Sequence, residues 1–385
     1  MEEVLPRARP AFVVVVIILT IVGSLAAAEL AFRLASSESR TAAAVEAQFR
    51  IRRHDGYYTR PRNTTFSAGN ERGQTISIET DEKGLRNPPG SYSAADTIVL
   101  GDSFVENVNT PAALTLVGQL RARGIHAYTA GVIAMGTFSE FYLLRDHLPD
   151  TGARTVVLGF YLGNDFHDNY WGNFIEGDEA RTMPALITSG KRSSVSSRIA
   201  GVVVRVCNIS QACHWVHREV FGGRLDRMLA DPMASWAIAE MLMLRSTDPR
   251  AEVAVIKTRA VLGKIVALVA SRGGRLLVLG IPSKAQVLRS FKEIEGFMDD
   301  SRSPEFAAET FRGEFSWDRP DRILSELCGE LAIPYVSLLE AFRSAVQQQP
   351  YYDLDAHWRD VGQRIAADVL TPALATAKRS ASKLR

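Results

Sequence analysis

Short apolar runs that alternate with stretches of helical period constrain the fold of this chain more than any other feature. Five runs rich in β-branched and aliphatic residues recur at 97–100, 126–129, 155–160, 276–279 and 334–336. Between several of them, apolar residues recur at helical spacing, at 113–123, 138–147, 254–271 and 321–331. Alternating strands and helices are typical of a parallel sheet with helices on both faces. The sequence therefore predicts an α/β fold.

The stretch TIVLGDSFVE, residues 97–106, ends the first of these strands in a glycine, a carboxylate and a hydroxyl. In parallel α/β sheets, ligands bind at the carboxyl ends of the strands, and Ser103 would lie there. Turn residues after a strand are common, so this stretch by itself is compatible with an ordinary loop. Gly101 and Asp102 would shape the turn, with Asp102 as a partner for its backbone.

A serine hydroxyl becomes an effective nucleophile when a base removes its proton and a third group orients that base. Of the seven histidines, His357 lies in YYDLDAHWRDVGQRIAADVL, residues 351–370, after a polar loop with two carboxylates. An amphipathic helix follows from about residue 361. A histidine in this loop can project over the sheet edge toward Ser103, and Asp355 or Asp353 could accept its ring N–H.

Two further segments that follow apolar strands could supply donors for the oxyanion of acyl transfer. In TAGVIAMGTFSE, residues 129–140, Gly131 and Gly136 permit tight turns that aim backbone N–H groups outward. In GFYLGNDFHDN, residues 159–169, Asn164 follows a strand and a glycine, and its side-chain amide is a suitable donor. A turn or a helix cap is the alternative role for Asn164.

Composition argues against several other classes of function. The net charge is +2 and the basic residues are scattered, which predicts no nucleic-acid partner. No CxxC pair or phosphate-binding glycine loop is present, so we expect no metal and no cofactor. The histidines of HWVH, residues 214–217, are interpreted as surface residues. Cys207 and Cys213 could form a disulfide in an oxidising compartment or remain two thiols.

The N-terminus carries AFVVVVIILTIVGSLAAAELAFRL, residues 11–34. This segment is long enough to cross a bilayer as a helix, which needs about 20 residues. Arg7 and Arg9 precede it, so we expect residues 1–10 in the cytoplasm and the body outside it, anchored in the inner membrane by one helix. A cleaved signal peptide is the alternative, because the strongest apolar run covers only 11–22 and alanines at 26–28 fit a cleavage site.

The rest of the chain divides by composition into a stalk, one large domain and a tail. Residues 35–74 are predicted to be a stalk or linker, and residues 75–375 the main domain. Residues 74–80 alternate as expected for a strand with one solvated face. Residues 170–250 interrupt the strand–helix alternation and are interpreted as a partly helical insertion. Residues 376–385 form a basic tail.

The motifs GDS, GND and DAHW, in that order and at those spacings, resemble the SGNH (GDSL-type) hydrolase family over roughly residues 75–375. The resemblance implies a flavodoxin-like, three-layer α/β/α fold with nucleophile Ser103 and base His357. It also implies an oxyanion hole formed by the Ser103 N–H, a second backbone N–H and the Asn164 side chain. The DxHW pattern resembles exported, membrane-anchored members linked to polysaccharide acetylation, and it favours Asp355 over Asp353 as the triad acid.

The chain departs from the family pattern in two places. The family often has its triad aspartate three residues before the histidine, where this chain has Leu354. Its second block usually reads Asn-x-Gly-Val-x-Gly, and here Thr129 replaces the asparagine and Ala134 the second glycine. Because the donor is a backbone N–H, alanine is compatible with this role, and the donor is Ala134 or Gly136.

These features together predict an extracytoplasmic serine esterase or O-acyltransferase that works through an acyl-enzyme. The resemblance implies O-acyl groups, chiefly O-acetyl groups, of a cell-surface polysaccharide as substrate, and the envelope polysaccharide machinery as a partner. Two alternatives stay open. One is a non-catalytic carbohydrate-binding or assembly component of an envelope complex, and the other is a lipase- or thioesterase-like acylhydrolase.

Overall fold

The computed structural model describes residues 51–52, 56–70, 72–133, 135–171, 242–243, 249–290, 316–353 and 356–382, with the isolated positions 24 and 293. Apart from position 24, these residues belong to one unit of the chain. Among them, no helix is long and apolar enough to cross a membrane. The predicted membrane segment 11–34, most of the insertion 170–250, Ala134, Asp355 and the two paired-cysteine candidates lie outside the described residues.

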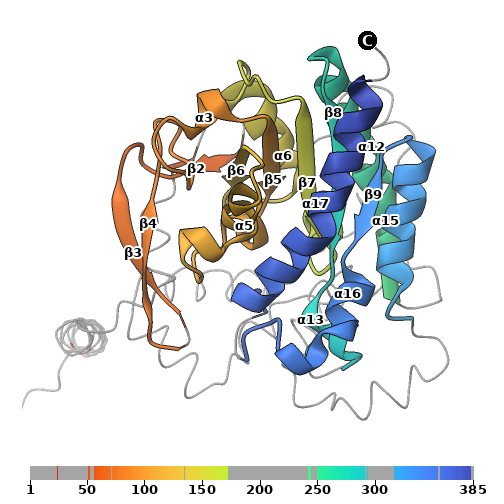
Figure 1. Ribbon diagram of the computed structural model, residues 1–385. Coiled ribbons are helices and arrows are strands. Elements are labelled where there is room, and N and C mark those ends of the chain that lie inside the picture. The colour runs from red at the N-terminus through yellow and green to blue at the C-terminus, as the bar shows by residue number, and fades with distance from the viewer. Residues whose placement is uncertain are drawn as a thin grey trace, which may run out of the picture. The chain divides into compact units, whose positions relative to one another are not determined.

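Five parallel strands form the central sheet, in the spatial order β6-β5-β7-β8-β9 (Figure 1). Their bounds are β5 Thr97–Gly101, β6 Ala127–Gly131, β7 Thr155–Tyr161, β8 Arg275–Ile281 and β9 Tyr335–Ser337. Counted from the first strand of this sheet, the order is 2-1-3-4-5, which is that of flavodoxin-like folds. The predicted α/β fold with a parallel sheet is confirmed.

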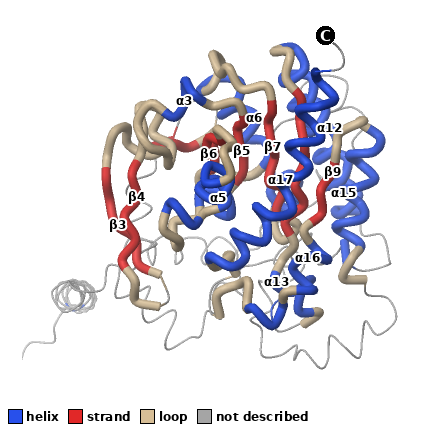
Figure 2. Tube along the Cα trace, in the orientation of Figure 1, coloured by secondary structure: helices blue, strands red, loops and turns tan. Residues whose placement is uncertain are grey.

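Successive side chains of the strands enter two separate cores, one on each face of the sheet. On β5, Ile98 and Leu100 belong to one core and Val99 to the other. The first core is covered by α6 Thr137–Tyr142, the π-helical segment Leu143–His147, α12 Pro249–Ser271 and α15 Arg319–Glu330. The second is covered by α5 Leu116–Ala122, α16 Leu339–Ser344 and α17 Asp360–Ser382. Helices thus form the two outer layers, drawn in blue around the red strands in Figure 2.

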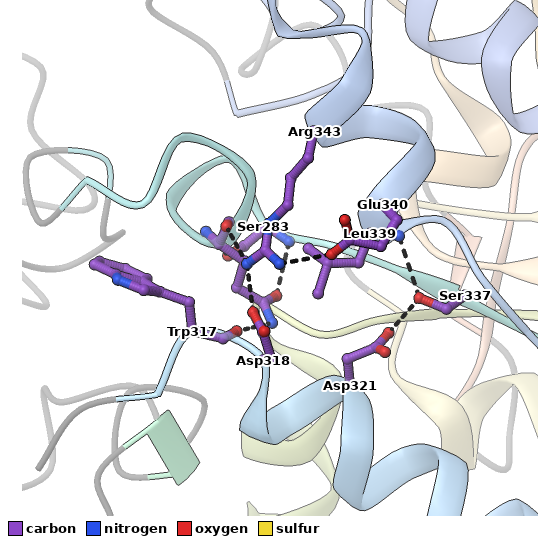
Figure 3. Close-up of polar contacts among 9 residues, drawn as sticks. Ser283, Trp317, Asp318, Asp321, Ser337, Leu339, Glu340 and Arg343 are labelled. Atoms are coloured by element: carbon purple, nitrogen blue, oxygen red, sulfur yellow. Dashed lines mark hydrogen bonds and ion pairs between the residues drawn. The ribbon is translucent and has the colours of Figure 1, made fainter.

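A polar network fastens the loop after β8 to the helices that follow (Figure 3). Ser283 and Gln286 form a capping box that starts α13 Lys284–Leu288, which satisfies N–H groups that the helix leaves free. The Gln286 amide donates to the Trp317 carbonyl at 2.9 Å, and Arg343 donates to the Gln286 carbonyl at 3.1 Å. Arg343 also contacts Asp318 and Glu340. This end of the sheet is therefore held by side chains from three helices.

Residues 65–69, within the segment that the sequence analysis interprets as a stalk or linker, form a strand of the folded unit. Strand β3 Thr65–Gly69 pairs antiparallel with β4 Thr75–Glu79, and both alternate exposed and buried residues. Figure 1 shows this hairpin beside the sheet. Its buried face packs with Val108, in the segment after Ser103; the residues of that face are Phe66, Ala68, Ile76 and Ile78. Apolar side chains at every second position therefore make this segment part of the folded core.

The remaining short elements connect the layers. They are β1 Ile51–Arg52, β2 Tyr58–Thr59, α3 Ser91–Ala94, α4 Ser103–Glu106, η1 Ala112–Leu114, α7 Asp165–Trp171 and η6 Val346–Gln348.

Candidate active site

Ser103 is the first residue of α4, directly after β5. Asp102 caps this helix, because its Oδ1 accepts a hydrogen bond of 2.8 Å from the Phe104 N–H, so its interpretation as a backbone partner is confirmed. A Cβ at Gly101 would lie 2.3 Å from Val105 Cγ2, and only glycine lets the strand end so close to the helix. Ser103 is thereby presented, half-buried, at the carboxyl edge of the sheet.

His357 Nε2 lies 2.7 Å from Ser103 Oγ, although 254 positions separate the two residues. The loop that carries His357 is closed by two backbone bonds: Tyr352 N–H donates to the His357 carbonyl at 3.1 Å, and Arg359 N–H donates to the Pro350 carbonyl at 2.9 Å. When His357 is neutral and its proton is on Nδ1, Nε2 accepts a hydrogen bond from the Ser103 hydroxyl. The contact has the geometry of a nucleophile and its base.

Aromatic packing fixes the plane of the imidazole. The Phe104 ring lies 4.8 Å from the ring of His357 and stacks on Tyr161 at 4.0 Å. Trp358, which is fully buried, packs edge-on against the Phe104 ring, with the two ring centres 5.4 Å apart. Phe104, the residue after Ser103, therefore packs against the His357 ring, a contact that sequence reasoning did not predict.

The triad acid stays a prediction, because Asp355 lies outside the described residues. Asp353 is exposed, and its backbone carbonyl accepts a hydrogen bond of 2.8 Å from Lys284 Nζ.

Two candidate oxyanion donors lie in the loops after the strands that flank β5. Gly136 caps α6 with extended backbone, and a Cβ there would lie 2.7 Å from Asp168 Cβ. Asn164 lies in the turn after β7, where its N–H donates to the Tyr161 carbonyl at 3.3 Å. The buried Asn164 Oδ1 has no hydrogen-bond partner among the described residues. Both residues share the sheet edge with Ser103, and their role as donors, like that of Ala134, stays a prediction.

Three buried carboxyl groups lie around the nucleophile turn, and sequence reasoning did not predict them. Burial raises the pKa of Asp102 to about 7, although the nearby His357 opposes the shift. Burial and the neighbouring carboxylates raise the pKa values of Glu140 and Asp165 well above the usual range. No set of histidines, cysteines and carboxylates in the described part of the chain has the arrangement of a metal site. The raised pKa values favour the protonated form of Glu140 and Asp165 over the ionised form.

Sequence reasoning also missed side chains that tie the loops of the site together. Glu106 binds Arg60 and the N–H of Ile133, and Asn107 binds the carbonyl of Trp358. The available signal was a glutamate and an asparagine three and four residues after Ser103, where buried polar residues require partners.

No family model matches this chain, and no curated protein matches it. Similar solved structures include an α/β hydrolase enzyme, LAE5, from the metagenome of Lake Arreo, Spain, at 11% identity over 74% of this chain and 97% of that chain, with a TM-score of 0.37. An acetyl xylan esterase matches at 11% identity over 72% of this chain and 98% of that chain, with a TM-score of 0.36. A GDSL-like lipase from Bacteroides thetaiotaomicron matches at 10% identity over 73% and 88%, with a TM-score of 0.35.

Similarities at this level carry no argument about activity, since one fold serves many functions. The fold follows from the strand order of this chain, and the site follows from the contact between Ser103 and His357.

Proposed function

We propose that this protein is a serine esterase of the SGNH type, and the observation that carries the proposal is the 2.7 Å contact between Ser103 Oγ and His357 Nε2. Ser103 attacks the ester carbonyl while His357 takes its proton. The imidazolium then protonates the leaving alcohol, and the acyl group stays on Ser103. Water, or a sugar hydroxyl in the transferase version, takes the acyl group with His357 again as base.

The supporting roles follow the family resemblance. Asp355 accepts the Nδ1–H of His357 and fixes the tautomer. The Ser103 N–H, the N–H of Ala134 or Gly136, and the Asn164 amide stabilise the oxyanion of the tetrahedral intermediate.

The proposed substrate is an O-acyl group, chiefly O-acetyl, of a cell-surface polysaccharide. The DxHW pattern supports this class, and the apolar segment 11–34 supports a single-pass anchor in the inner membrane with the catalytic unit outside the cytoplasm. Protease protection of spheroplasts, compared with permeabilised cells, tests this orientation.

Fluorophosphonate labelling and p-nitrophenyl acetate turnover test the catalytic proposal. We expect the wild type to label, and Ser103→Ala to lose labelling entirely. Loss of the nucleophile or of His357 should lower kcat by roughly 10⁴-fold or more. Ser67→Ala, at an exposed serine of β3, is the matched control and should label normally. If wild type and Ser103→Ala label equally poorly, the protein is a non-catalytic component.

A second pair of measurements defines the acyl group and its acceptor. A preference for acetyl over octanoyl esters supports the polysaccharide esterase, and the reverse preference supports a lipase- or thioesterase-like enzyme. Mass spectrometry of glycans incubated with an acetyl donor separates transfer from hydrolysis.

A further inference from the structure

Glu106, three residues after Ser103, is a buried carboxylate that forms a two-pronged ion pair with Arg60. Arg60 Nε donates to Glu106 Oε1 at 2.7 Å, and Arg60 Nη2 donates to Glu106 Oε2 at 2.9 Å. The two side chains are 0% and 1% exposed. A carboxylate removed from water to this degree needs such a counter-charge, and the fork geometry fixes its orientation.

The same carboxylate reaches the loop after β6. Glu106 Oε2 also accepts a hydrogen bond of 2.7 Å from the N–H of Ile133. On the other side of the nucleophile, the Gly101 carbonyl accepts a hydrogen bond of 3.3 Å from the N–H of Val132. A Cβ at Gly131 would lie 2.8 Å from the Glu106 nitrogen. Residues 131–133 and 135–136 are here called the oxyanion loop, and its residues 131–133 are thus attached to the segment of Ser103 on both sides of that serine.

We propose that Glu106 is a positioning residue that sets the oxyanion loop relative to Ser103, with Arg60 holding its carboxylate in place. Ser103 and Glu106 lie on one helical turn, so the element that carries the nucleophile also fixes the loop that supplies the backbone donor. Oxyanion donors act at about 2.7–3.1 Å from the developing charge, and a misplacement of about 1 Å can cost about 100-fold in rate. This inference rests on the proposed esterase function.

Through Arg60, the segment before the sheet also helps to position the oxyanion loop. Arg60 comes from the chain before β3, where its N–H donates to the Gly84 carbonyl at 2.8 Å. Its guanidinium also lies 5.4 Å from the centre of the Phe66 ring. The segment before β3 therefore supports the oxyanion loop through the buried ion pair of Arg60 with Glu106.

Steady-state kinetics of Glu106→Ala, Glu106→Gln and Arg60→Met test the proposal. The control is Tyr128→Phe, which removes a buried hydrogen bond of 2.6 Å from Tyr128 to Asp81. That bond also joins the early segment to β6, but it does not involve α4. We expect Glu106→Ala to lower kcat by roughly 10- to 100-fold with little change in KM. Glu106→Gln keeps an acceptor oxygen and should retain more activity, and Tyr128→Phe should keep the wild-type kcat.

Hydrogen exchange of the oxyanion loop, read by mass spectrometry, gives a result that does not depend on turnover. Exchange should rise in the Glu106 variants and stay unchanged in Ser103→Ala and Tyr128→Phe. If the wild type turns over esters but the folded Glu106 variants match Tyr128→Phe in kcat and in exchange, the inference is overturned and the esterase proposal stands. If the wild type is inactive and exchange still rises in the Glu106 variants, the esterase proposal fails while the anchoring of the loop holds. Where Glu106→Ala does not fold, Glu106→Gln decides by the same two readouts.

Discussion

Asn107 Nδ2 donates a hydrogen bond of 3.1 Å to the carbonyl oxygen of Trp358, a residue 251 positions away. Asn107 directly follows α4, and Trp358 directly follows His357, so this bond joins the segment of Ser103 to the loop that carries His357. The neighbouring Glu106 joins the same helix to the oxyanion loop. The last turn of α4 is therefore where two loops of the site are attached.

Asn107→Gly should lower kcat by roughly 10-fold, because the loop of His357 loses its anchor to the serine segment. Asn107 has a φ of 40°, which glycine adopts without strain, so the stability loss should be about 1 kcal/mol for one hydrogen bond. Asn107→Ala keeps the kinetic defect and adds about 1 kcal/mol of backbone strain. Urea unfolding and kinetics of both variants check this, and a wild-type kcat in Asn107→Gly would show that His357 is held by other contacts.

Gly101→Ala should destabilise the protein by about 1–3 kcal/mol through overpacking. The new methyl group would lie 2.3 Å from Val105 Cγ2. Val105→Ala removes Val105 Cγ2. The double variant should therefore be destabilised by less than the sum of the two single variants, with a coupling energy of about 1 kcal/mol or more. Denaturant unfolding of all four proteins measures the coupling, and simple additivity would contradict the proposed contact.

The free energy of unfolding should fall as the pH rises above about 4, because three buried carboxyl groups hold protons in the native state. Their pKa values in the unfolded chain are about 4, whereas burial raises that of Asp102 to about 7 and those of Glu140 and Asp165 well above normal. Between the two values the native state binds more protons, so each group contributes a decline of up to about 1.4 kcal/mol per pH unit.

Glu140→Gln should therefore give a shallower decline of stability with pH. Glu326→Gln makes the same chemical change at an exposed residue of α15 and should leave the slope unchanged. Urea titrations at several pH values from about 5 to about 8 measure both slopes. Equal slopes in Glu140→Gln and wild type would mean that Glu140 is ionised in the native state.

Asp102→Asn should retain stability and most of the activity, because an asparagine oxygen can still accept from the Phe104 N–H. Asp102→Ala should lower the free energy of unfolding by about 1 kcal/mol, the usual contribution of a helix N-cap residue. Asp355→Asn should instead lower kcat by about 10⁴-fold if Asp355 fixes the tautomer of His357. If Asp102→Asn lowers kcat by about 10⁴-fold and Asp355→Asn leaves it unchanged, Asp102 is the acid that supports His357.

The strands and the closeness of Ser103 to His357 were predictable from the sequence and its motifs. In strand β5 the three residues before Gly101 are apolar, and the carboxyl ends of parallel strands lead into loops at the same edge of the sheet, so Ser103 and Asn164 could be assigned to one edge. The extent of the folded unit was not predictable in the same way. Residues 65–69 read as part of a polar linker, and only their pairing with residues 75–79 reveals the apolar face that they bury.

The sequence by itself determined the α/β architecture, because periodicity and turn chemistry act over short distances. The family resemblance of its motifs, rather than periodicity, suggested that the Ser103 turn meets the His357 loop. Tertiary structure alone decided which side chains hold these parts in register. The ion pair of Arg60 with Glu106 and the bond from Asn107 to Trp358 each depend on partners from distant segments, and the raised pKa of Glu140 depends on its burial. Burial makes unpaired polar and charged groups costly in free energy, so these contacts matter for stability. Burial is a property of the packed fold rather than of any one stretch of chain.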